Sequence, residues 1–177
     1  MNTIRRALFA AFAAASLPAA DLAAQQAAPP PLAGEPRAAD AFIQVIPTEG
    51  RAPVRVAVAQ VVRVGRAEGY TVLDTSAYVQ QRTVESVEAV ARRLAAAGQR
   101  LIALTDLRDA RTYLAADRVV LVREPYEQHA VGARAAIVMA GLRFNTDVAV
   151  RETVEQVMAA LERAAARGDA LETPAAR

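Results

Sequence analysis

The residues best suited to acid–base or metal chemistry lie in one short stretch, Arg-Glu-Pro-Tyr-Glu-Gln-His over positions 123–129. His129 is the only histidine of the chain. With Glu124 or Glu127 it could act as a general base, and with a further carboxylate such as Asp106 it could hold a divalent metal. The same residues are also typical of a solvated loop, because the histidine has no partner at a fixed spacing. These three residues are therefore candidates for catalysis, and we predict no metal site.

A second polar stretch follows the apolar run Leu101–Leu104. In open α/β sheets ligands bind beyond the carboxyl ends of the strands, which favours this position for a small-ligand site. An alternative is that its aspartates cap a helix and pair with arginine at the surface. The predicted ligand-binding residues are Asp106, Arg108, Asp109, Arg111 and Tyr126.

Several chemistries are excluded by residue type. The chain has no cysteine, which rules out disulfides, thiol catalysis and cysteine-based zinc sites. All 21 basic residues are arginine, so a Schiff-base lysine and a phosphate-loop lysine are also excluded. No nucleophile elbow, dinucleotide-binding glycine pattern or His-Glu-x-x-His motif occurs. We accordingly predict no cofactor.

Charge and aromatic content argue against nucleic-acid binding. The formal net charge is +2, and the arginines alternate with acidic residues instead of forming a basic stripe. Four tyrosines, four phenylalanines and no tryptophan give little material for base stacking. The predicted partner is a protein or a small molecule, and not a nucleic acid.

The fold class is read from the stretch between residues 70 and 106, which has the pattern of a strand, a helix and a second strand. Tyr70–Leu73 is rich in strand-forming residues, Val84–Ala97 is amphipathic with Thr83 as its expected cap, and Gly98 ends the helix. Leu101–Leu104 lacks polar alternation, which suits a strand buried on both faces at the sheet centre. The prediction is an α/β fold, with mixed α+β possible: one domain with a mixed sheet of four to six strands, two main amphipathic helices and one β-α-β unit.

The remaining elements are less sharply defined. The valines from Val54 onward recur with period two, which predicts a half-buried strand and a hairpin with the strand at Tyr70, although a helix over 54–66 also fits. The other expected elements are helical turns over Asp109–Ala116, strands at Arg118–Val122 and Ala135–Ala140, and a last helix over Val148–Arg167.

One segment resembles another within the chain. Glu-Ser-Val-Glu-Ala-Val at 85–90 matches Glu-Thr-Val-Glu-Gln-Val at 152–157. A duplicated half-domain would explain the match, and so would two amphipathic helices built from a narrow set of residues. We favour the second explanation, because the match does not extend beyond the helices.

The N-terminus predicts export. Arg5 and Arg6 precede the apolar run Ala7–Leu17, and Leu22-Ala-Ala24 suits cleavage before Gln25. The expected organisation is a signal peptide at 1–24, a Pro/Ala-rich linker at 25–40, one domain at 41–168 and a disordered tail at 169–177. The mature protein would then be periplasmic or secreted, with no transmembrane segment left after signal cleavage.

Two functions are compatible with these features. The favoured hypothesis is an exported, non-catalytic domain that binds a protein partner, a small ligand or an envelope component. The alternative is a small hydrolase or metal-dependent enzyme that uses His129 and nearby carboxylates. The ligand, the partner and the oligomeric state do not follow from the sequence.

Overall fold

The computed structural model describes residues 41–50, 52–127, 129–142 and 147–172, without the side chains of 168–172. The predicted signal peptide and linker lie outside these residues. The predicted tail lies partly within them, because the last helix extends to Glu172.

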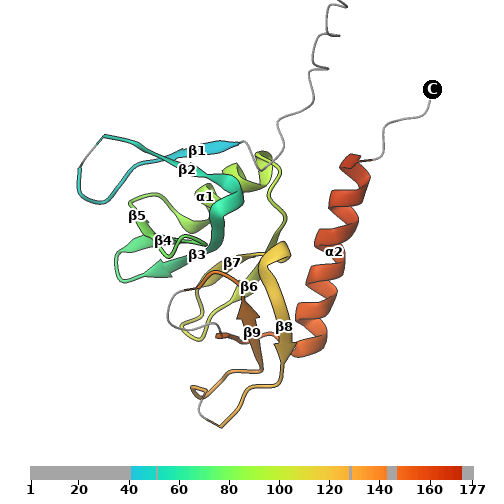
Figure 1. The fold of residues 1–177 in the computed structure, drawn as a ribbon. Helices are drawn as coiled ribbons and strands as arrows, with labels where there is room; N and C mark the ends of the chain where they lie inside the picture. Colours follow the sequence, from blue (N-terminus) through green and yellow to red (C-terminus); the bar gives the residue numbers. More distant parts are fainter. Residues whose placement is uncertain (1–40, 51, 128, 143–146, 173–177) are drawn as a thin grey trace, which may run out of the picture. The chain divides into compact units, whose positions relative to one another are not determined.

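The described chain consists of ten strands, two α-helices and two short 3-10 helices, in the order shown by colour in Figure 1. The first set of elements is β1 (Phe42–Val45), β2 (Val54–Ala57), η1 (Val58–Gln60), β3 (Val61–Ala67), β4 (Tyr70–Thr75), β5 (Gln80–Thr83) and α1 (Val87–Ala96). The second set is β6 (Leu101–Thr105), β7 (Arg111–Ala115), η2 (Ala116–Arg118), β8 (Val119–Arg123), β9 (Ala135–Met139), β10 (Asp147–Val150) and α2 (Val154–Glu172).

The strands form three sheets in which all pairs are antiparallel. β1 and β2 form a two-stranded sheet, β10-β9-β8 a three-stranded sheet, and β5-β4-β3-β7-β6 a five-stranded sheet. The prediction of an α/β fold with a β-α-β unit is therefore wrong. Two strands lie between β4 and β6 in the sheet, and β5 lies between β4 and α1 in the chain, so the helix does not connect neighbouring parallel strands.

Several predicted elements also need correction. The segment 54–66 is neither one strand nor a helix, because η1 divides it into β2 and β3. The turns expected at Asp109–Ala116 are the strand β7, and the first residues of the predicted last helix form β10. β6 is an edge strand with Ala103 exposed, so it is not central, although Leu104 is buried. An unbroken apolar run does not reveal how many neighbours a strand has.

Other expectations are confirmed. β3 and β4 form the predicted hairpin through the turn at Gly69, whose φ is +79°. α1 is amphipathic as predicted, with Val87, Val90, Ala91 and Leu94 buried, and it ends before Gly98, which has a φ of +90°. Its cap is Ser86 instead of Thr83: the Ser86 hydroxyl accepts from the Ala89 N–H at 3.2 Å.

The two sets of elements follow the same order, two strands, a 3-10 helix, three strands and an α-helix, and we call them the first module (41–97) and the second module (100–172). Their strand registers correspond residue by residue. Phe42 lies opposite Ala57 in one hairpin, as Leu101 lies opposite Ala115 in the other. Each module also has an irregularity at the same point of its third strand, between Val61 and Arg63 and between Val119 and Leu121.

Side chains reinforce the correspondence at the start of each α-helix. The Ile46 N–H donates to the Glu85 carboxylate at 3.1 Å, and the Thr105 N–H donates to the Glu152 carboxylate at 3.0 Å. Each glutamate therefore ties the end of its module's first strand to the helix that closes the module.

The backbone repeats further contacts at matching positions. The Ser76 N–H donates to the Gln60 carbonyl, and the Ala140 N–H donates to the Arg118 carbonyl, both at 2.8 Å. Because the match includes registers, irregularities and hydrogen bonds, the sequence similarity of 85–90 and 152–157 belongs to a structural repeat. The explanation that we favoured from the sequence, two helices of biased composition, is wrong.

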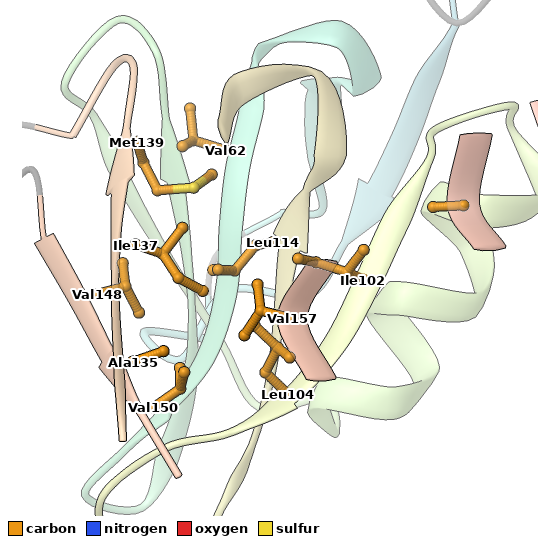
Figure 2. Packing of buried hydrophobic residues seen from close by; sticks show 11 residues of the cluster. Val62, Ile102, Leu104, Leu114, Ala135, Ile137, Met139, Val148, Val150 and Val157 are labelled. Carbon is orange, nitrogen blue, oxygen red and sulfur yellow. The ribbon is translucent and has the colours of Figure 1, made fainter. Parts of the chain in front are cut away.

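Each module has its own hydrophobic core, and the cores meet at the module boundary. The first core includes Leu73, Val90 and Leu94. The second core contains Ile102, Leu114, Ile137 and Met139, and it also takes in Val62 from the first module (Figure 2). Residues of β3 therefore serve both modules, which joins the repeats into one packed unit.

Candidate docking surface

The predicted catalytic loop forms a closed cluster around Asp147. Arg123 hydrogen-bonds to Asp147, and this contact raises the pKa of the Arg123 guanidinium above its ordinary value. The other guanidinium nitrogen, Nη1, donates to the Tyr126 hydroxyl at 2.9 Å. The carbon of the guanidinium lies 4.2 Å from the centre of the Tyr126 ring.

His129 belongs to the same cluster. Its Nδ1 lies 2.8 Å from the Tyr126 backbone nitrogen and 3.1 Å from the Tyr126 carbonyl oxygen, and its Nε2 lies 3.5 Å from the Asp147 carboxylate. Glu124 and Glu127 are exposed at the surface of this loop. Among the described residues, no group of three histidine or acidic side chains could hold a metal ion. The contacts give His129 a role in ordering the loop, and its role as a general base stays a prediction.

The predicted ligand-binding residues do not form a single site. Asp106 is the start of the turn between β6 and β7, where its carboxylate accepts from the backbone N–H groups of Arg108 and Ala110 at 2.9 and 2.8 Å. Asp109, with a φ of +60°, pairs with Arg151 at 2.8 Å. Arg111 is exposed on β7, and Tyr126 belongs to the loop after β8. Ligand binding at the Asp106 turn stays a prediction.

A cleft of about 580 Å³ is lined by residues of β3 and β4 on one side and of β10 on the other. Its wall includes Arg63 and Asp74, which form an ion pair at 2.6 Å, and Gln80, whose amide donates to Asp74 at 2.7 Å. Asp106 also lies along the cleft. Arg63, Asp74 and Gln80 therefore satisfy one another in this wall, and Asp106 accepts from backbone N–H groups of its own turn.

The comparison of the two modules reveals a different kind of surface. In the first module, the apolar residues of β3 and α1 are at most 3% exposed: Val61, Val62, Val64, Val87, Ala91 and Leu94. The second module contacts both elements, because β7 pairs with β3 and contacts α1, and Val62 packs into the second core. The matching residues of the second module are all more exposed: Val119, Val120, Val122, Val154, Met158 and Leu161.

Two of these differences are large. Val120 is 62% exposed where Val62 is fully buried, and Met158 is 43% exposed where Ala91 is 3% exposed. Leu121, next to Val120, is 43% exposed. We call these exposed apolar residues of β8 and α2, Val120, Leu121 and Met158, the β8–α2 surface. In Figure 1, α2 runs beside β8 in the second module.

The β8–α2 surface also has an open strand edge. Within the described residues β8 pairs with β9 alone, whereas its counterpart β3 pairs with both β4 and β7. The surface therefore combines unpaired backbone groups with exposed apolar side chains, which is the usual composition of a surface that binds another polypeptide.

Sequence reasoning missed this surface. The similarity between 85–90 and 152–157 was the signal that could have revealed it, because alignment of the two helices places Met158 opposite Ala91. The hydrophobicity of these residues alone does not indicate that they are exposed. Comparison with their counterparts in the first module does. Among the described helices, none has the length and apolarity needed to cross a lipid bilayer.

Comparisons with known proteins give little further guidance. No family model matches the chain, and no curated protein matches it. A solved structure that does match is the LytTr DNA-binding domain of a methyl-accepting/DNA response regulator from Bacillus cereus. The TM-score is 0.41 with 10% sequence identity, and the match covers 67% of this chain and 91% of that chain.

The description of this neighbour, a DNA-binding domain of a response regulator, conflicts with four predictions made from the sequence. These are the exported, non-catalytic binding domain, the signal peptide, the exclusion of nucleic-acid partners, and the periplasmic or secreted location. We do not propose these four again. A likeness at a TM-score of 0.41 assigns neither DNA binding nor a cellular location to this chain.

Proposed function

We propose that this protein acts by self-association, with copies of the chain assembling through the β8–α2 surface. The observation that carries the proposal is the difference in exposure between matching residues of the two modules, above all Met158 at 43% against Ala91 at 3%. In the first module the matching face is occupied by a hairpin of the same fold. The second module presents this face without such an occupant among the described residues.

The physical driving force is the burial of apolar area together with strand pairing. Each fully buried aliphatic side chain contributes about 1.5–3 kcal/mol relative to an exposed one. Pairing of an open edge adds backbone hydrogen bonds that need no specific side chains. Association also costs several kcal/mol of lost translational and rotational freedom. A surface with three exposed apolar anchors therefore favours reversible association over a permanent complex.

The test is sedimentation velocity of the full-length chain across a wide range of concentrations. Leu121→Arg introduces a charge at the open edge and should abolish the concentration-dependent species. The matched control is Val131→Arg, because Val131 is fully exposed in the loop after β8, away from the edge. This control should sediment like the wild type. A wild-type chain that stays monomeric at all concentrations contradicts the proposal.

A further inference from the structure

We infer that the association is head to tail: the β1–β2 hairpin of one copy docks on the β8–α2 surface of a second copy, as the β6–β7 hairpin docks on the first module within one chain. The inference rests on the proposed function and adds to it the identity of the docking element and its register.

The contact within the chain supplies the template. β7 pairs with β3, with Leu114 opposite Arg63 and Tyr113 opposite Val64. Two side chains of the second module donate to carbonyls of the first: Thr112 Oγ1 to Val64 at 3.2 Å and Arg118 Nη2 to Ala59 at 2.9 Å. Gln99, which lies between the modules, donates from Nε2 to the Val61 carbonyl at 2.8 Å. The hairpin thus adds two strands to β3 and covers α1.

Both elements needed to repeat this contact between copies are available. β2, the counterpart of β7, pairs with β1 alone within the described part of the chain. β8, the counterpart of β3, is the open edge of the β10-β9-β8 sheet. The β1–β2 hairpin of one copy can therefore pair with β8 of a second copy, and its own β8 can pair with the hairpin of a third.

The exposed side chains on the β1–β2 hairpin match this arrangement. Leu101 on the β6–β7 hairpin packs against the first core, and its counterpart Phe42 is 63% exposed. Ile46, the counterpart of Thr105, is 50% exposed. The opposite side of the hairpin, with Ile43, Val45 and Val56, is buried in its own module. Phe42 therefore lies at the position that contacts the neighbouring module in the template.

Transfer of the register from the template defines the contact between copies. Leu121 of one copy lies opposite Val56 of the other, and Val122 lies opposite Arg55. Phe42 of the docking copy then covers the region of Met158, as Leu101 covers the core that contains Leu94. The pairing joins two different surfaces, so it can continue from copy to copy. The product is an open chain with one free hairpin and one free β8–α2 surface, or a closed ring with neither.

The contact between copies is weaker than the contact within the chain for two reasons. Arg55 replaces Tyr113, which packs against the first core. Gln60 replaces Arg118, whose guanidinium supplies one of the hydrogen bonds across the module boundary. These exchanges make the association reversible, while the two modules of one chain stay together.

The experiment uses two full-length variants with complementary defects. Phe42→Arg disables the hairpin, and Met158→Glu disables the receiving face. Both positions are exposed, so both variants should fold like the wild type, which circular dichroism and thermal melting verify. In sedimentation velocity each variant alone should associate at least about ten-fold more weakly than the wild type. An equimolar mixture should form a 1:1 heterodimer and no larger species, because one intact hairpin meets one intact face.

The outcomes separate this inference from the proposed function. If Phe42→Arg associates like the wild type while Met158→Glu stays monomeric, copies associate symmetrically through the β8–α2 surface, and only the head-to-tail inference is overturned. The same holds if both variants are monomeric and their mixture is monomeric too. If the wild type never associates, both proposals fall.

Discussion

At the scale of single residues, the repeat identifies positions where the two modules had to differ. Gly141 is one of them: its φ is +90°, and an added Cβ would lie 2.9 Å from the Cα of Ser76 and 3.2 Å from a methyl carbon of Val62. The matching residue in the first module is Ala77, which is exposed. A glycine is needed in the second module because the backbone of the first approaches it there.

Gly141→Ala should therefore destabilise the protein by more than the usual cost of a positive φ. That usual cost is about 1 kcal/mol, and a clash with backbone that cannot rotate away adds about 1–3 kcal/mol. Urea denaturation of both variants measures the difference. The matched control is Gly69→Ala, because Gly69 also has a positive φ but has open space around its Cβ position. Equal losses of stability in the two variants would show that the approach of the modules at Gly141 is not tight.

At the scale of elements, the sequence predicted local structure well where it depends on neighbouring residues. The buried stripe of α1, the stop at Gly98 and the hairpin of β3 and β4 are of this kind. The short strands β5 and β10 were missed. β5, with the sequence Gln-Gln-Arg-Thr, has no hydrophobic alternation and is a strand because β4 offers it an edge.

The fold class was predicted wrongly because it depends on contacts between segments that are far apart in the sequence. A strand, a helix and a strand in succession have the same hydrophobic pattern whether the strands are parallel neighbours or belong to separate hairpins. The decisive contact is β3 with β7, about fifty residues apart in the chain, and nothing local specifies it. Asp106 and Asp109 order a hairpin turn, which looks like a polar ligand-binding loop in sequence. Ligand binding at this turn stays a prediction.

The N-terminus of α2 gives a pH-dependent prediction. Glu155 lies in its first turn, and hydrogen bonds from its own backbone N–H and from Thr153 lower the pKa of its carboxyl group. Because the pKa is lower in the folded state, the carboxylate stabilises the fold above its ordinary pKa, and this stabilisation is lost as the pH falls through the lowered value. Glu155→Gln should therefore reduce the melting temperature by more at pH 7 than at pH 3.

The control for this prediction is Glu162→Gln, which removes a carboxylate from the same helix beyond its first turn. It should change the melting temperature at pH 7 less than Glu155→Gln does, since the amide dipoles act within one turn of the helix end. A Glu155→Gln effect that is the same at both pH values would exclude the carboxylate charge as its cause.

At the scale of the whole molecule, the described residues contain two copies of one module. The contact between these two modules, in which the β6–β7 hairpin pairs with β3, is the contact that we propose to form again between copies of the chain. Tandem repeats stack by nearest-neighbour contacts, so the terminal repeats carry the faces that internal repeats bury. Here the first module contributes an exposed hairpin with Phe42, and the second contributes an exposed receiving face with Met158. Repeat proteins commonly have polar residues at such ends. The exposed apolar residues Phe42 of the first module and Met158 of the second are the reason to expect assembly.

The most direct measurement of this account is hydrogen–deuterium exchange of the wild-type chain at low and high protein concentration. The account predicts that exchange slows with concentration in peptides covering β8 (119–123) and β2 (54–57), because these two edges pair between copies. Peptides covering β5 (80–83), also the edge of a sheet, should exchange at the same rate at both concentrations. Exchange in β8 and β2 that does not depend on concentration, or slowing at β5 in their place, would contradict it.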